Sequence, residues 1–149
     1  MPTTPYALVR SAGPVHRKSK RELVQLSRSL ERAALEGSPP AVAAALQDAR
    51  FLTERTRDVY ASLAAAGAPA RLHARGLQSW VAPGVTGVEL DDDDPLVDEW
   101  VVVVPGPEPV VLAATDLHVP DGPDAERAFT VGVCRDPHVV ASCGRLLGI

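Results

Sequence analysis

The order of patterns along this chain predicts an α+β fold built around one sheet. Apolar residues recur at helical spacing in the first half, and alternating or β-branched runs fill much of the second half. A last apolar stripe at helical spacing closes the chain. This order predicts two or three N-terminal helices, a mixed, mainly antiparallel sheet of about five strands, and one C-terminal helix. The length of 149 residues fits a single domain over residues 1–149.

The N-terminal region contains a helix with a well-marked start. Residues 1–18 carry three prolines and a glycine, which predicts an irregular N-terminal arm. Ser19 and Glu22 then form a capping-box pattern, in which each side chain accepts from a free backbone N–H of the first turn. We expect a helix over 19–36 that Gly37 ends in a left-handed conformation. Its apolar face is formed by Leu23, Leu26, Leu30 and Ala33.

A second helical region is predicted from Ser38 to about Ala66. Ser38 and Pro39 are of the types that begin a helix, as N-cap and first-turn proline. Apolar residues at helical spacing would share one face: Val42, Leu46, Ala49, Leu52, Val59 and Leu63. Thr53 followed by Glu54 can cap a fresh helix, and the polar stretch 50–58 favours a split of this region into two helices.

The chain changes to strand patterns from Pro69 onward. Five strands are predicted, at residues 70–75, 85–90, 99–104, 109–115 and 127–133. A Pro-Gly-Pro turn joins the third strand to the fourth as a hairpin, and residues 118–125 form a loop. Short links between consecutive strands predict an antiparallel meander. Asp136 and Pro137 then begin the last helix, whose stripe contains Val139, Val140, Cys143, Leu146 and Leu147.

Charge and composition indicate which kinds of binding partner and which cellular location to expect. The net charge of −4 gives no general reason to expect nucleic acid or an anionic membrane. Residues 1–36 hold seven Lys/Arg against three Asp/Glu, so this segment is either solvated helix surface or a contact surface. Two cysteines make no disulfide framework, no apolar run reaches the roughly 18 residues that span a bilayer, and no signal-peptide order is visible. We therefore expect a cytoplasmic protein.

The sequence carries no clear motif for catalysis or metal binding. The glycines are isolated, so none forms a phosphate-binding loop. Cys134, His138 and Cys143 could supply three metal ligands, but on a helix positions 138 and 143 point about 140° apart. The run Asp91–Asp94 lacks the alternation of a calcium loop and predicts a solvated loop. We expect no enzymatic activity and no metal site, and these patterns identify no cofactor.

A family resemblance rests on several stretches in a fixed order. The most telling is Asp94-Pro95-Leu96-Val97-Asp98-Glu99-Trp100, and the others are residues 23–31, Gln47 with Phe51, and residues 60–64, 101–106, 114–117, 127–129 and 134–136. Over about residues 5–148 the chain resembles the DICT sensory domain, with Cys134 where the family often has Thr. The resemblance implies sensing in bacterial signal transduction or transcription control. By analogy alone, the arrangement is similar to GAF and PAS sensory folds.

Three functions follow as hypotheses. The first is a stand-alone sensory or regulatory module that binds a small ligand between sheet and helices, or a signalling partner protein, with candidate ligand-binding residues Glu99, Trp100, Asp116 and Arg135. A core position is the alternative for Trp100. The second is a protein-interaction module without ligand, a weak homodimer through Val24, Arg28 and Leu35 of the N-terminal helix. The third, an uncharacterised hydrolase, requires Glu99, Asp116 and a histidine to converge.

Overall fold

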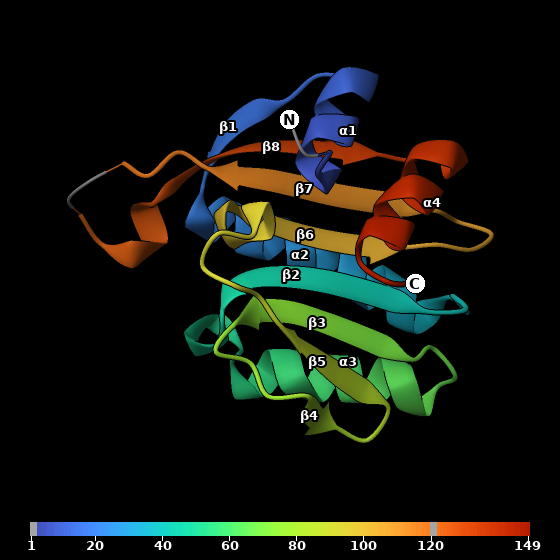
Figure 1. The fold of residues 1–149 in the computed structure, drawn as a ribbon. Helices are drawn as coiled ribbons and strands as arrows, with labels where there is room; N and C mark the ends of the chain where they lie inside the picture. Colours follow the sequence, from blue (N-terminus) through green and yellow to red (C-terminus); the bar gives the residue numbers. More distant parts are fainter. Residues whose placement is uncertain (1–2, 120–121) are drawn as a thin grey trace.

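An eight-stranded sheet forms the centre of the computed structural model, which describes residues 3–119 and 122–149 (Figure 1). The strand order is β1-β8-β7-β6-β2-β3-β5-β4. The strands are β1 (His16–Ser19), β2 (Val42–Asp48), β3 (Ala70–Arg75), β4 (Trp80–Ala82), β5 (Val85–Glu89), β6 (Glu99–Val104), β7 (Val110–Asp116) and β8 (Ala128–Cys134). The helices are α1 (Pro5–Ala12), α2 (Lys20–Glu36), α3 (Glu54–Ala65) and α4 (Pro137–Leu146), with short 3-10 turns η1 (Ala49–Phe51), η2 (Pro95–Asp98) and η3 (Asp124–Glu126).

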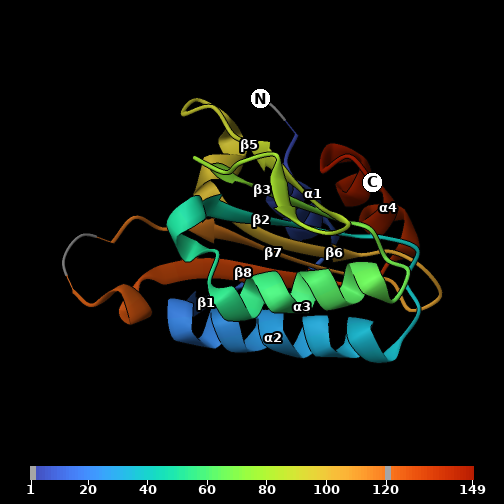
Figure 2. The same ribbon diagram turned by 90° about the horizontal axis from the view of Figure 1, so that it is seen from below.

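Helices cover both faces of the sheet, so the molecule has three layers. Helices α2 and α3 lie side by side on one face, and α1 and α4 lie on the other (Figures 1 and 2). Side chains alternate between the faces along each strand, as β6 shows. Trp100 and Val102 pack in the core under α2 and α3, whereas Val101 and Val103 pack under α1 and α4. The sheet therefore contributes to two separate hydrophobic cores.

Several local predictions are confirmed. The class is α+β, with five antiparallel and two parallel pairings in a mixed sheet. Ser19 and Glu22 form both bonds of the capping box, Thr53 caps α3, and Asp136 caps α4. The five expected strands all form, and β6, β7 and β8 make the antiparallel meander. The number of strands was wrong, because β1, β2 and β4 were not foreseen.

The segment Val42–Asp48 is a strand and not the predicted helix. It lies in the middle of the sheet, parallel to β3 and antiparallel to β6. Six of its seven residues are buried, because a central strand covered on both faces is apolar on both sides. Such a run has no period of two, so its alanines and single leucine match a helical face equally well.

Within the N-terminal arm, where irregular chain was predicted, the described residues form a helix and an edge strand. Thr4 caps α1 and Pro5 occupies its first turn, so this proline begins a helix. Residues 16–19 then pair with β8 as an edge strand. At the end of α2, Gly37 is extended, with φ of −88°, where a left-handed conformation was predicted. No helix among the described residues is both long and apolar enough to cross a membrane.

The buried face of α2 is rotated from the predicted one. Its buried residues are Lys20, Leu23, Ser27, Glu31 and Ala34, whereas Leu26 and Leu30 are only partly buried and Ala33 is exposed. Ser27 is buried because its hydroxyl accepts a hydrogen bond of 2.9 Å from Trp100 Nε1. This bond to a buried tryptophan gives Ser27 a polar partner on the side of α2 that faces the sheet.

Candidate functional site at the carboxyl end of the sheet

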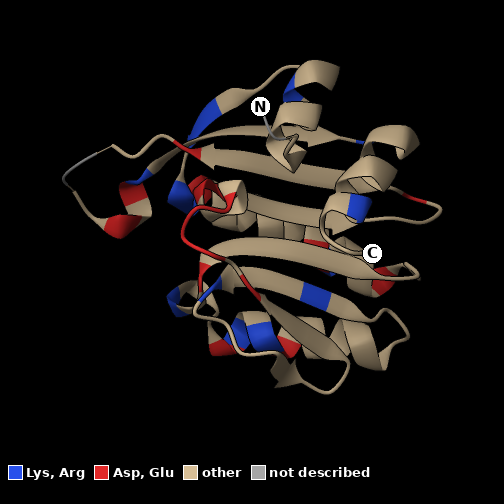
Figure 3. Cartoon of the chain, viewed as in Figure 1, with Lys and Arg blue, Asp and Glu red and all other residues tan. Residues whose placement is uncertain are grey.

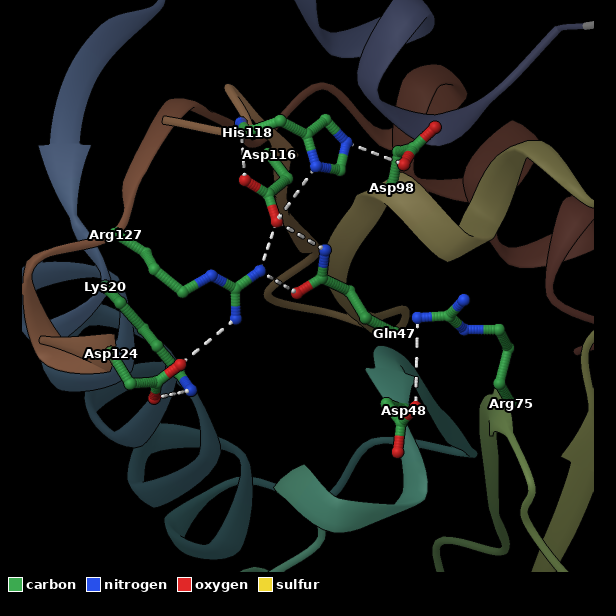
Figure 4. Close-up of polar contacts among 9 residues, drawn as sticks. All are labelled: Lys20, Gln47, Asp48, Arg75, Asp98, Asp116, His118, Asp124 and Arg127. Atoms are coloured by element: carbon green, nitrogen blue, oxygen red, sulfur yellow. Dashed lines mark hydrogen bonds and ion pairs between the residues drawn. The ribbon is translucent and has the colours of Figure 1, made fainter. Parts of the chain in front are cut away.

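Polar side chains gather at one end of the sheet, where β2, β3 and β7 finish and β6 and β8 begin. We call the set drawn in Figure 4 the carboxyl-end cluster: Lys20, Gln47, Asp48, Arg75, Asp98, Asp116, His118, Asp124 and Arg127. Figure 3 shows charged residues of both signs around this end, while most of the strands carry neither. The cluster borders an open hollow of about 530 Å³, the polar hollow. In sheets with parallel strands, this end is the usual place for a ligand.

Asp116 is the buried centre of the cluster. Its side chain, 3% exposed, accepts hydrogen bonds from Arg127, from Gln47 Nε2 at 3.1 Å and from the backbone N–H of His118 at 2.8 Å. Burial alone would raise the pKa of this carboxyl group, but the hydrogen bonds and the guanidinium outweigh burial and lower it. Asp116 is therefore an ionised anchor for the groups around it.

Gln47 reaches Asp116 through an unusual backbone. Its φ of 69° lies in the left-handed region, and the pairing of β2 with β3 shifts register between Ala45 and Asp48. Such a bulge re-aims a side chain, here so that Gln47 donates to Asp116 and accepts from Arg127 at 3.3 Å. His118 also has a positive φ, of 51°. Two non-glycine residues in a costly conformation border one hollow, which is typical of a functional site.

A second arm of the cluster pairs His118 with Asp98 across the mouth of the hollow. The two side chains are exposed and meet at 2.8 Å, between His118 Nε2 and Asp98 Oδ1. His118 Nδ1 lies 3.9 Å from Asp116 Oδ2. On the far wall Arg75 lies 3.8 Å from Asp48. Side chains from the ends of several strands thus place basic and acidic groups around the hollow.

Phe51 forms the wall between the polar hollow and a second depression, and cations surround its ring. Lys20 Nζ lies 3.7 Å from the ring centroid, Arg50 lies 4.8 Å away and Arg127 5.3 Å away. Asp124 of η3 binds Lys20 and also lies 3.4 Å from Arg127. The hydrogen bond from Lys20 is the main reason that the pKa of Asp124 is lowered.

The second depression, the helix groove, runs between α2 and the start of α3 and measures about 570 Å³. Trp100 and Phe51 contribute its aromatic surface, with ring centroids 6.5 Å apart, and Val24, Arg28 and Glu31 are among its walls. Burial raises the pKa of Glu31. Arg50, Phe51 and Asp124 border both the groove and the polar hollow. The two depressions therefore adjoin along Phe51.

The residues predicted to bind ligand do not form one site. Asp116 borders the polar hollow and Trp100 the helix groove, so these two lie in adjoining depressions. Glu99 pairs with Thr115 and faces α1, where its carboxylate accepts from the N–H of Tyr6 at 2.9 Å. Because side chains alternate along a strand, Glu99 cannot share a depression with Trp100 or Asp116. Arg135 borders a different hollow, of about 320 Å³, at the opposite end of the sheet.

Sequence reasoning missed Gln47, Phe51 and Arg127 as site residues. Gln47 and Phe51 belonged to the family resemblance and to a segment predicted as helix, and Arg127 belonged to the resemblance and to the start of a predicted strand. A usable signal is the change from apolar to polar residues at Gln47-Asp48, which marks the end of a buried strand. The predicted dimer residues Val24 and Arg28 lie on the wall of the helix groove, and Leu35 is exposed further along α2. In residues 3–119 and 122–149 no group of three or more His, Cys, Asp or Glu side chains could hold a metal ion.

Comparison with known proteins identifies the family. The family model DICT, described as a sensory domain in diguanylate cyclases and two-component systems, matches residues 6–115. This chain belongs to the DICT family of sensory domains. Five residues of the cluster lie within the match and four lie beyond it. Those within are Lys20, Gln47, Asp48, Arg75 and Asp98, and those beyond are Asp116, His118, Asp124 and Arg127. No curated protein sequence matches the chain.

Solved structures share the fold at 12% sequence identity. The match to the polyphosphate kinase from Porphyromonas gingivalis has a TM-score of 0.59 and covers 91% of this chain, which spans only 22% of that protein. The archaeal chromatin protein TrmBL2 matches with a TM-score of 0.54, over 91% of this chain and 51% of its own. The phospholipase D family member Nuc from Salmonella typhimurium matches with a TM-score of 0.53, over 90% and 91%. At this identity the likeness concerns the fold alone.

Proposed function

We propose that this DICT domain binds a small ligand where the polar hollow meets the helix groove, and that it acts by contact with a signalling or regulatory partner protein. The observation that carries this proposal is the strained Gln47, whose side chain joins Asp116 and Arg127 at the border of an open hollow. Strain at an open, polar surface is otherwise a cost to folding. The family, a sensory domain in diguanylate cyclases and two-component systems, supports a role in signal transduction. A role in bacterial transcription control is part of the same proposal.

The chemistry of the cluster favours binding over catalysis. Asp116 accepts three hydrogen bonds and has a lowered pKa, which makes it a poor proton acceptor. The hydrolase hypothesis required Glu99, Asp116 and a histidine to converge. Instead Glu99 points to the opposite face of the sheet, because it lies beside Thr115 in the register with β7. A non-enzymatic module is therefore the function that we propose.

Thermal shift measurements test the ligand. The folded domain is screened against nucleotides, flavins, tetrapyrroles and small metabolites, and a ligand at about 100 times its Kd should raise the Tm by about 5–10 °C. Arg50→Ala should reduce this shift, because Arg50 borders both depressions. The matched control is Arg57→Ala, an exposed arginine of α3 that borders neither. A shift that Arg57→Ala reduces as much as Arg50→Ala would place the ligand elsewhere.

Association through α2 is the second candidate function. Leu35 is 37% exposed on the side of α2 that also carries Val24 and Arg28. A second copy of the chain on this surface would cover the helix groove and form a symmetric, weak dimer. Replacing Val24 and Leu35 together by Asp should yield a folded monomer in light scattering, whereas Gln25→Asp, on another side of α2, should leave the dimer intact. Identical elution of the double variant and the wild type would exclude this surface.

A cytoplasmic location and the class of partner belong to the same proposal. Cys134 and Cys143 are both free thiols, and burial raises the pKa of Cys143 to about 12. A net charge of −4 supports a module that contacts neither nucleic acid nor a membrane directly. Cell fractionation with an antibody against the native protein checks the location.

A further inference from the structure

The carboxylate of Asp124 has the position that an anionic ligand would take. It comes from η3 and binds Lys20 at the start of α2, 104 residues away in the chain, and it also contacts Arg127. The burial of the partners is unequal. The side chains of Lys20 and Arg127 are 11% and 23% exposed, whereas that of Asp124 is 59% exposed. The cations are thus held in the wall of the molecule, and the more exposed anion lies where a dissolved anion can reach them. Figure 4 shows Asp124 between Lys20 and Arg127.

The cations exceed the carboxylates that contact them. Lys20, Arg50 and Arg127 all lie over the ring of Phe51. Of the described carboxylates, Asp116 contacts Arg127, and Asp124 contacts Lys20 and Arg127, while Arg50 makes no ion pair. Asp116 is buried and bound to Gln47, so it cannot leave. Without Asp124, three cations would face one carboxylate, which is the arrangement of an anion-binding site.

We infer that Lys20, Arg50 and Arg127 form the anion subsite of the ligand pocket, and that Asp124 fills it as an internal carboxylate until a ligand carboxylate or phosphate replaces it. This inference rests on the proposed function and adds the chemical class of the ligand. The guanidinium of Arg127 and the ammonium of Lys20 suit both oxyanions. Phe51 and Trp100, which continue from the subsite into the helix groove, suit a ligand with a flat, apolar body beside its anionic group.

A ligand that displaces the Asp124 carboxylate also changes the surface of the domain. The contact of Asp124 with Lys20 joins η3 to the first turn of α2, and η3 packs against that helix. A ligand that takes over Lys20 separates the two elements. The surface next to the start of α2 therefore differs between the free and the bound domain, and a partner protein can distinguish them.

The experiment compares anion binding by Asp124→Asn and the wild type. Inorganic phosphate and succinate are titrated by calorimetry at constant ionic strength. Asp124→Asn should bind at least one of them about tenfold more tightly. The substitution removes the negative charge of Asp124, which would otherwise repel the bound anion from a distance of about 4 Å. Glu126→Gln is the matched control, because Glu126 borders the same hollow from the same turn and contacts none of the three cations among the described residues. Asp124→Glu keeps the internal carboxylate and should behave as the wild type.

The outcomes separate this inference from the proposed function. If Asp124→Asn and Glu126→Gln gain equal affinity for the anions, or if neither gains any, Asp124 does not occupy an anion subsite. A gain that is lost again when Arg127→Gln is added to Asp124→Asn supports the subsite. A gain in affinity for phosphate alone indicates a phosphorylated ligand, and a gain for succinate alone indicates a carboxylate.

The thermal screen separates the two proposals. If it finds a ligand that binds Asp124→Asn and the wild type equally, the proposed ligand site is kept and the anion subsite is rejected. If Asp124→Asn gains anion binding but no screened compound shifts the wild type, the anion subsite stands and the ligand-binding proposal falls.

Discussion

At the carboxyl end of the sheet, a buried carboxylate, an amide and a guanidinium bind one another around a strained strand end. At the opposite end, prolines and aliphatic side chains line a smaller hollow beside the exposed Arg135. Both ends contain turns and loops, and both offer space to a ligand. Only the carboxyl end has non-glycine residues with positive φ, among the residues that the structure describes. The difference favours the carboxyl end as the candidate site, because polar groups are held there in costly conformations.

Removing Asp116 should have the largest effect. Asp116→Ala leaves Arg127 and Gln47 without their buried acceptor and should lower the free energy of unfolding by about 3 kcal/mol. Asp98→Ala, which removes an exposed carboxylate at the same end, should cost less than about 1 kcal/mol. Urea denaturation of both variants measures the two losses. Similar losses would mean that the cluster is surface charge and not an internal network.

The backbone of Gln47 offers a second, smaller test. Gln47→Gly and Gln47→Ala both lose the hydrogen bonds to Asp116 and Arg127, but only glycine adopts a φ of 69° without strain. The glycine variant should therefore be the more stable by about 1 kcal/mol. At Ala33, an exposed position within α2, the order should reverse, with Ala33→Gly losing about 1 kcal/mol. A more stable alanine variant at position 47 would show that the strand end is relaxed.

The pH dependence of stability separates Glu99 from Asp116. Burial raises the pKa of Glu99, so the folded state binds more protons there, and stability from this group is lost as the pH rises above its ordinary value of 4.5. Asp116 has a lowered pKa, so its contribution is present above the ordinary value of 3.8 and is lost as the pH falls below it. Glu99→Gln should remove part of the loss of stability as the pH rises above 4.5, and it should leave the loss below pH 3.8 unchanged. Thermal unfolding between pH 3 and 7 measures both, and an unchanged slope above pH 4.5 would contradict the role of Glu99.

Arg135 should show the smallest effect. It is exposed at the opposite end of the sheet, so Arg135→Ala should change the free energy of unfolding by no more than about 0.5 kcal/mol. It should also leave ligand-induced thermal shifts unchanged, in contrast to Arg50→Ala. If Arg135→Ala abolished those shifts, the ligand would lie in the proline-lined hollow and the carboxyl end would be structural.

The candidate site was partly predictable. Asp116 and Trp100 were identified as ligand candidates, and they do lie in adjoining depressions. Glu99 and Trp100 were both predicted to bind ligand, but neighbours on a strand face opposite ways. Gln47 could not be chosen, because it lies in a strand whose apolar run was assigned to a helix, and its bulge depends on pairing with β3.

The sequence by itself determined what depends on nearby residues: the caps of α2, α3 and α4, the antiparallel meander of β6, β7 and β8, and the family. Capping groups and turns act within a few residues, so their patterns can be interpreted without knowing the fold. Only the tertiary structure decided that Val42–Asp48 is a central strand and that Ser27 and Glu31 face inward. It alone brought Lys20, Phe51, Asp116 and Arg127 to one end of the sheet. These outcomes depend on partners far away in the chain, because burial on both faces removes the strand period and a cluster of charges forms only where strand ends meet.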